Sequence, residues 1–122
     1  MRMSEIGYEG LPPIDSYGGG GFRISDEFLE GDLLLFPTGG VGPWDAASMS
    51  AAQFSDVIGD AAQIDVLLVG MGAEIAMLPR DARDALEAAG VGVEVMSTAS
   101  ACRTYNVLLA EGRRVAAALI AV

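Results

Sequence analysis

The C-terminal quarter of the chain carries the clearest pattern of apolar and polar positions. An apolar stripe at helical spacing runs through Ala101, Cys102, Tyr105, Leu108 and Leu109. Ser97 or Thr98 can cap the start of this helix, and Gly112 is placed to end it. Every residue from 115 to 122 is apolar, which predicts a strand covered on both faces. We therefore expect the chain to end on a strand in the middle of the fold.

Two more helix and strand pairs precede this run. A helix capped by Ser48 or Ser50 is expected to reach Asp60, and its apolar stripe contains Phe54, Val57, Ile58 and Ala61. A buried strand follows at 65–69. A second helix begins at Pro79 and stops at Gly90, and the strand 91–95 follows it. This alternation predicts a largely parallel sheet with helices packed on it.

The first 45 residues are rich in strand signals and lack helix signals. We expect short strands at 14–17, 22–24 and 32–36, an acidic turn at 25–31 and a loop at 39–43. The glycines 18–21 predict a hairpin link, and a backbone cradle for an anion is the alternative. Residues 1–45 should therefore add a β meander or a second layer to the alternating part, 46–122, within a single domain over 1–122.

Length and composition favour one compact soluble domain. The 122 residues are 52% hydrophobic and 20% charged, a balance typical of folded rather than disordered chains. The longest apolar run, 115–122, is far shorter than the roughly 20 residues that span a bilayer. The first residues show neither an apolar signal core nor an Arg-rich transit segment. We therefore expect a cytoplasmic location and no membrane span.

Charge and missing residue types exclude many functions. The net charge is −10, with 17 acidic residues against 7 basic ones, so nucleic acid and anionic membranes are poor partners. The chain has no His and no Lys, which removes the commonest general base, the commonest metal ligand and the Schiff-base amine. A single cysteine, Cys102, can form neither an internal disulfide nor a thiolate metal cluster. We expect no metal and no cofactor.

Gly70-Met-Gly72 after a buried strand invites comparison with dinucleotide-binding loops. The third glycine of that fingerprint would fall at position 75, which is Ile75, and the next helix signal waits until Pro79. The spacing therefore favours a tight strand exit with close backbone packing over nucleotide binding.

The carboxyl ends of the predicted parallel strands are the best place for a ligand. A candidate anion pocket there would use Gly70, Gly72, Thr98, Arg103 and Thr104. The helix beginning near Thr98 would present its positive end, and Arg103 would add a fork of donors for a carboxylate or phosphate. The interpretation we favour over this pocket is that Arg103 pairs with an acid and ties the helix to the sheet.

Two further side chains could carry chemistry or packing. Cys102 lies near a helix start, where a thiolate is stabilised, but it falls on the apolar stripe and has no histidine to activate it. A packed, inert thiol is therefore favoured over a nucleophile. Trp44 follows a loop rich in Gly and Pro, where we expect a packing anchor with its N–H on a carbonyl. Ligand stacking is the alternative for Trp44.

The segments 101–108 and 111–119 resemble the signature of a small domain family. Matching pieces occur in order at 14–18, 22–24, 31–37, Trp44 and 65–72. The best-known member of this family is mitochondrial NADH dehydrogenase (complex I) assembly factor 3, and its bacterial members are mostly domains of unknown function. The resemblance implies an α/β (α+β-like) fold, a three-layer β/β/α domain with a mixed sheet. It marks Cys102, Tyr105, Asn106, Glu111 and Arg113 as motif residues. We interpret these as structural, with Asn106 holding a neighbouring loop by its amide and Glu111 and Arg113 holding the turn from helix to strand.

Three functions stay open on these grounds. The resemblance implies a non-catalytic assembly or interaction protein with a protein partner, and Met49, Met71, Met77 and Met96 could offer adaptable contact surface or fill the core. The second function is an anionic-ligand binder or enzyme using the pocket near Gly70, Gly72 and Arg103. The third is a self-associating structural domain.

Overall fold

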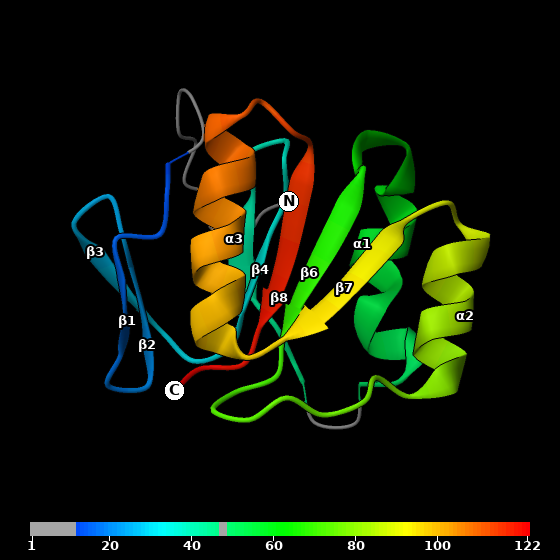
Figure 1. The fold of residues 1–122 in the computed structure, drawn as a ribbon, viewed down its shortest axis with the longest axis horizontal. Coiled ribbons are helices and arrows are strands. Elements are labelled where there is room, and N and C mark those ends of the chain that lie inside the picture. The colour runs from blue at the N-terminus through cyan, green and yellow to red at the C-terminus, as the bar shows by residue number, and fades with distance from the viewer. Residues whose placement is uncertain (1–11, 47–48) are drawn as a thin grey trace.

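Two sheets and three α-helices make up the part of the chain that the computed structural model describes, residues 12–46 and 49–122 (Figure 1). The strands are β1 (Ser16–Gly18), β2 (Gly21–Ile24), β3 (Glu27–Glu30), β4 (Leu33–Leu35), β5 (Val41–Pro43), β6 (Val66–Gly70), β7 (Gly92–Met96) and β8 (Val115–Leu119). The helices are α1 (Ser55–Gly59), α2 (Arg80–Ala88) and α3 (Thr98–Ala110), and short 3-10 turns at Ala51–Phe54 and Ala61–Gln63 flank α1.

The larger sheet has five strands in the order β5-β4-β8-β6-β7. β8, β6 and β7 run parallel to one another, whereas β4 is antiparallel to both β8 and β5. The alternating part of the sequence thus forms the parallel half of a mixed sheet, as predicted. The expected strands at 65–69 and 91–95 each lie one residue further along the chain. The last strand of the chain is the central strand of the sheet.

Strand β8 is buried on both faces. Val115, Ala117 and Leu119 pack with the core under α3, while Ala116 and Ala118 pack with the core under α1 and α2. The prediction of a strand covered on both faces is therefore confirmed for Val115–Leu119. Its predicted extension to residue 122 is wrong, because the ladder ends at Leu119. Beyond that point the Ala121 N–H donates to Asp32 Oδ1 at 2.8 Å, and Val122 is 38% exposed.

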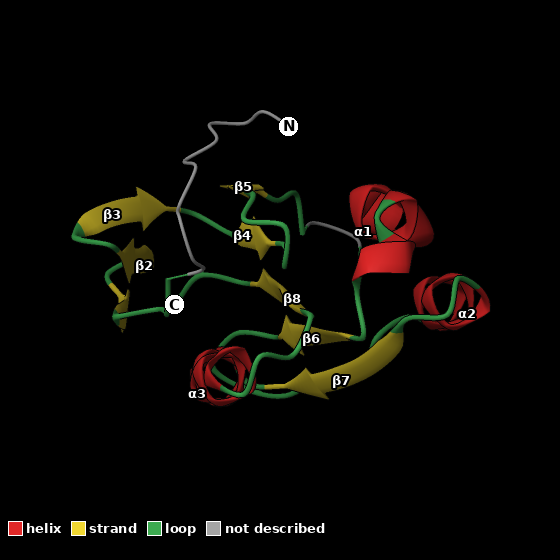
Figure 2. Ribbon diagram, turned by 90° about the horizontal axis from the view of Figure 1, so that it is seen from above, coloured by secondary structure: helices red, strands yellow, loops and turns green. Residues whose placement is uncertain are grey.

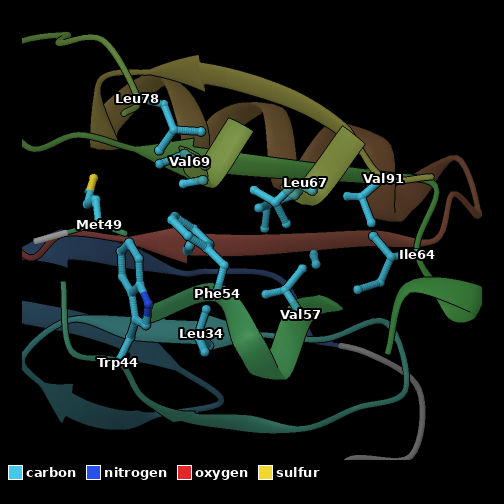
Figure 3. Packing of buried hydrophobic residues seen from close by; sticks show 14 residues of the cluster. Leu34, Trp44, Met49, Phe54, Val57, Ile64, Leu67, Val69, Leu78 and Val91 are labelled. Carbon is cyan, nitrogen blue, oxygen red and sulfur yellow. The ribbon is translucent and has the colours of Figure 1, made fainter. Parts of the chain in front are cut away.

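One face of the sheet is covered by α1 and α2 (Figure 3). Trp44 packs here against Phe54 with ring centroids 5.3 Å apart, and its Nε1–H donates to the Gln53 carbonyl at 2.9 Å. The prediction of a packing anchor is thus confirmed. The helical stretch predicted to begin after Ser50 and to reach Asp60 is confirmed in extent, because a 3-10 turn at Ala51–Phe54 runs directly into α1, whose C-cap is Asp60. Its first turn is 3-10 rather than α-helical. Ser50 precedes this turn, and Ser48 lies outside the described residues.

The opposite face of the sheet carries α3 and the antiparallel meander β1-β2-β3 side by side (Figure 2). Phe22 and Ile24 of β2 are fully buried there. The fold is therefore the expected α/β class, with a central mixed sheet and an N-terminal meander. The sheet lies between the layer of α1 and α2 and the layer that α3 shares with the meander.

The glycine run forms the predicted hairpin link. Gly18 pairs with Gly21, and Gly19 and Gly20 between them have φ of +66° and +86°, the combination that a type I′ turn requires. The Gly20 N–H donates to the Val122 carbonyl at 2.8 Å. The run thus closes a hairpin and also holds the C-terminal segment.

Two N-terminal predictions are wrong. The stretch 25–31 is a two-residue turn followed by β3, and the stretch 39–43 contains β5. β3 is largely exposed, and its two apolar residues, Phe28 and Leu29, are adjacent rather than alternating with polar ones. Its sequence therefore lacks the strand pattern, and pairing with β2 holds it. The Gly and Pro in β5 predict a loop. β5 is an edge strand of the larger sheet, however, and a proline such as Pro43 is tolerated there.

Candidate functional site

Three of the predicted pocket residues, Gly70, Gly72 and Thr98, meet where β6 ends and α3 begins. Thr98 is completely buried. Its Oγ1 accepts the Gly72 N–H at 2.9 Å and donates to the Ile120 carbonyl at 2.7 Å, and its own N–H donates to the Gly72 carbonyl at 2.9 Å. The hydroxyl therefore bonds three segments of the chain together.

Gly70 allows these segments to approach closely. A Cβ at this position would lie 3.0 Å from both the Thr98 Cα and the Leu119 Cδ2, so these neighbours would have to move by a few tenths of an ångström. No helix starts directly after Gly72, because α2 begins at Arg80. The geometry is that of a tight strand exit rather than of a phosphate-binding loop.

Arg103 and Thr104 lie on the outer side of α3. Arg103 is exposed and its Nη2 contacts the Ser100 Oγ at 3.3 Å, one turn earlier on the same helix. Thr104 is half-buried. Among the described residues no carboxylate pairs with Arg103, so the expectation that it ties the helix to the sheet is wrong. The five predicted pocket residues thus divide into a buried group of three and a surface pair.

Cys102 and Tyr105 face the core below α3, and each is 2% exposed. Burial raises the pKa of the Cys102 thiol to about 11, although the nearby Arg103 charge opposes the shift. Burial also raises the pKa of the Tyr105 hydroxyl to about 12. Both groups are neutral at physiological pH, so neither offers an anionic nucleophile or base.

Asn106 joins α3 to the segment before β1. Its Oδ1 accepts the Ile14 N–H at 2.8 Å, and its Nδ2 donates to the Ile14 carbonyl at 2.9 Å. The amide therefore holds both backbone groups of a single residue, 92 positions away in sequence. This is the use of the amide that the sequence suggested.

The turn from α3 into β8 is closed by backbone bonds around Glu111 and Arg113. The Gly112 N–H donates to the Leu109 carbonyl and the Arg113 N–H donates to the Leu108 carbonyl, both at 3.0 Å. This pair of bonds is a Schellman motif, which satisfies the last carbonyls of a helix. Glu111 occupies the C-cap position. These residues lie at the opposite end of α3 from Thr98.

Arg114 and Asp65 form an ion pair that the sequence analysis missed. Arg114 Nη2 lies 2.7 Å from Asp65 Oδ1, and Arg114 Nη1 donates to the Ala62 carbonyl at 3.2 Å. The hydrogen bond from Arg114 lowers the pKa of the Asp65 carboxyl. The two residues directly precede the neighbouring parallel strands β6 and β8. Opposite charges just before two strands that are predicted to be adjacent and parallel would have indicated this ion pair from the sequence.

Of the four methionines that could offer contact surface, Met77 lies on the surface of the molecule. Met49 is buried, and Met71 and Met96 pack against the two cores. Met77 is 91% exposed and Ile75 is 64% exposed. They line an open hollow of about 310 Å³ together with Ala76, Leu78, Arg83 and Val95. This apolar hollow between the loop before α2 and strand β7 carried no motif in the sequence.

Within residues 12–46 and 49–122, no three carboxylate or thiol side chains are grouped so as to hold a metal ion. In those same ranges, no helix has the length and apolar character needed to cross a bilayer.

Comparison with known proteins gives matches over nearly the whole chain. An uncharacterized protein of Rhodobacter capsulatus is 48% identical and aligns with 98% of this chain and 93% of its own length. Human NADH dehydrogenase [ubiquinone] 1 alpha subcomplex assembly factor 3 is 34% identical over 88% of this chain. The alignment covers 59% of the human protein, so the chain spans about three fifths of that relative.

Solved structures share the same fold. A crystal structure described as an outer membrane protein from Bartonella henselae matches with a TM-score of 0.86 and 42% identity, covering 93% of this chain and 97% of that one. The solution structure of a Mth938-like domain from Bordetella pertussis matches with a TM-score of 0.81 and 30% identity, covering 99% and 92%. Residues 14–120 match the model of the family described as "Protein of unknown function (DUF498/DUF598)". The chain belongs to this DUF498/DUF598 family, as the resemblance of its C-terminal signature implied.

Proposed function

We propose that this chain is a non-catalytic accessory protein that binds another protein during the assembly of NADH dehydrogenase. The names of the relatives that resemble it over 88% of its length support this role. Those relatives are longer than this chain, so the shared domain would supply the binding activity rather than every property of the longer proteins. We further propose that it acts in the cytoplasm.

The observation that carries this proposal is that the reactive side chains of α3 are used inside the fold. The Thr98 hydroxyl bonds α3 to two other segments, and the Asn106 amide bonds α3 to Ile14. The Cys102 thiol is buried with its pKa raised to about 11. Side chains used in this way hold structural elements in place or are unreactive. This favours a role in binding another protein over a role in catalysis.

Deletion of the gene in its native host tests the proposal. We expect the amount of assembled NADH dehydrogenase on a native gel to fall, and a plasmid copy of the wild-type gene to restore it. An affinity-tagged chain should copurify with a subunit or another accessory protein of that enzyme. Unchanged assembly in the deletion strain, with no such protein recovered, would contradict the role.

A second role, binding of an anionic small molecule at Arg103 on the surface of α3, is favoured by one observation. The Arg103 guanidinium is exposed and contacts a hydroxyl rather than a carboxylate, so its charge is available to a ligand. Thermal-shift measurements with phosphate, nucleotides and small carboxylates test this role. A ligand that stabilises the wild type but not Arg103→Ala would favour it over protein binding.

A further inference from the structure

Strand β7 forms one edge of the five-stranded sheet, beside the hollow lined by Ile75, Met77 and Val95. We propose that this edge accepts an extended segment of a partner protein as an additional strand, with one apolar side chain in the hollow and a basic side chain opposite Glu94. This inference rests on the proposed role in protein binding and specifies the surface and the chemistry of the partner.

The backbone of β7 presents unpaired groups on its outer side. At its two ends, the Gly92 N–H donates to the Asp65 carbonyl and the Met96 carbonyl accepts the Met71 N–H. Residues in a parallel ladder point their N–H and C=O alternately to one side and the other. Val93 and Val95 therefore direct two donors and two acceptors away from β6. Within the described residues no strand pairs with them (Figure 2).

The features that usually protect an edge strand are scarce in β7. Natural edges are commonly blocked by proline, lysine, a bulge or very short length. β7 has five residues, all in regular register with β6, and contains no proline. Its single charge is the exposed Glu94. The edge is thus able to pair with an added strand, in the manner of other domains that bind extended peptides.

The hollow supplies a place for a side chain of the added segment. Val95 contributes to both the edge and the hollow, so a strand paired with β7 would run along the rim. The hollow measures about 310 Å³ and its lining is mostly apolar. Arg83 at its border already pairs with Glu87 at 3.5 Å. The flexible Met77 side chain can adjust to different apolar residues.

The negative charge of the molecule decides which kind of strand can pair with β7. The chain has a net charge of −10, and Glu94 stands at the middle of the edge. Pairing of two copies about a two-fold axis through this strand would bring two Glu94 side chains together and would join two strongly acidic molecules, both of which are unfavourable. A strand with Lys or Arg opposite Glu94 is attracted both by that carboxylate and by the net negative charge of the molecule. A basic partner segment is therefore favoured over a second copy.

A synthetic peptide with blocked ends and alternating Val and Lys, eight residues long, tests the proposal on the full chain. Binding is followed by the amide shifts of the ¹⁵N-labelled protein. We expect the largest shifts at Val93, Val95 and residues 74–78. A peptide with Glu in place of Lys, and a Lys peptide interrupted by prolines, should each bind at least tenfold more weakly.

Two variants and one control sharpen this test. Val95→Pro removes an outward N–H without touching the bonds to β6, and should weaken binding at least tenfold. Glu94→Lys should reverse the preference, so that the Glu peptide binds better than the Lys peptide. Glu111→Lys, an equal change of charge at the exposed end of α3, should leave the preference unchanged. If Val95→Pro does not fold, the test rests on whether Glu94→Lys reverses the preference between the two peptides while Glu111→Lys leaves it unchanged.

Several results would overturn the proposal. These are shifts centred on another element, equal binding of all three peptides, an unchanged preference in Glu94→Lys, and dimerisation of the free chain through β7. Failure here is distinct from failure of the proposed function. A chain with Glu94→Lys that still recovers the native partner as the wild type does would reject this surface and leave the accessory role intact. Normal NADH dehydrogenase assembly in the deletion strain would reject the accessory role whatever the peptide does.

Discussion

Two neighbouring regions of this molecule, the start of α3 and the outer edge of β7, satisfy their polar groups in opposite ways. Thr98 is completely buried, and its hydroxyl both accepts and donates a hydrogen bond within the fold. Two residues earlier in the chain, β7 ends with a row of backbone groups that no described strand pairs, next to the exposed Ile75 and Met77.

The difference separates residues that build the fold from residues that are available to a partner. The family signature lies mostly in α3 and β8, where Asn106 joins the helix to the N-terminal segment and Cys102 and Tyr105 pack in the core. The two most exposed of the large apolar side chains described, Ile75 and Met77, lie in a loop without any motif. A search for function that follows only the signature therefore leads to the parts that stabilise the domain.

The largest expected effect comes from Thr98→Val, which keeps the shape of the side chain and removes its hydroxyl. The Gly72 N–H and the Ile120 carbonyl would each lose a buried partner, and such a loss costs about 1–3 kcal/mol per group. We expect the free energy of unfolding in urea to fall by about 2–6 kcal/mol in total. Thr104→Val, on the half-exposed side of the same helix, should change it by less than about 0.5 kcal/mol. Equal effects of the two changes would contradict a structural role for Thr98.

The buried thiol of Cys102 gives a pH-dependent prediction. Its pKa in the folded chain is about 11, above the value of about 8.5 for a free thiol. Between these values the unfolded chain loses a proton that the folded chain keeps, so stability should decrease as pH rises from about 8.5 to 11. Cys102→Ala should show a weaker decrease over this range. The same slope in both proteins would argue against the shifted pKa.

Alkylation provides an independent measure of the same thiol. At pH 8 the folded chain should react with iodoacetamide at least about a hundredfold more slowly than the urea-unfolded chain, because the thiolate is scarce and shielded. Comparable rates would show that Cys102 is accessible and reactive, and would weaken the contrast between the two regions.

The smallest expected effect on stability comes from Met77→Ser. Met77 is 91% exposed, so its replacement should change the free energy of unfolding by less than about 0.5 kcal/mol. Met49→Ser is the matched control, since Met49 is 7% exposed and its loss from the core should cost about 2–5 kcal/mol. A large loss of stability from Met77→Ser would mean that this side chain supports the fold rather than a partner.

The elements with a local signal could be predicted from the sequence. β8 is apolar throughout and is buried on both faces, and α3 has a capping Ser97, whose Oγ accepts the Ser100 N–H at 3.2 Å, and a glycine at its end. The N-terminal hairpin was visible in its glycines. The strand signals of residues 1–45 indicated a meander or a second layer, and the resemblance supplied the mixed sheet that periodicity alone left open.

The rest depends on contacts between distant segments. β3 is largely exposed, lacks an alternating pattern and is held by pairing with β2. The turn before it places Ser25 and Asp26 at positive φ of 52° and 66°, and no glycine marks it in the sequence. The candidate pocket assumed space at the strand ends, whereas Gly70 lets Thr98 approach and fill it. The β7 edge follows from the order of strands in the sheet, which local patterns do not encode.

Complementation of the deletion strain compares the two regions most directly. One plasmid carries Cys102→Ala with Arg103→Ala, and the other carries Met77→Asp with Glu94→Lys, both expressed at wild-type level and with melting temperatures near that of the wild type. The quantity measured is assembled NADH dehydrogenase on a native gel. Our account predicts that the first pair restores assembly as the wild-type gene does and that the second pair does not. Restoration by the second pair together with failure of the first would contradict it.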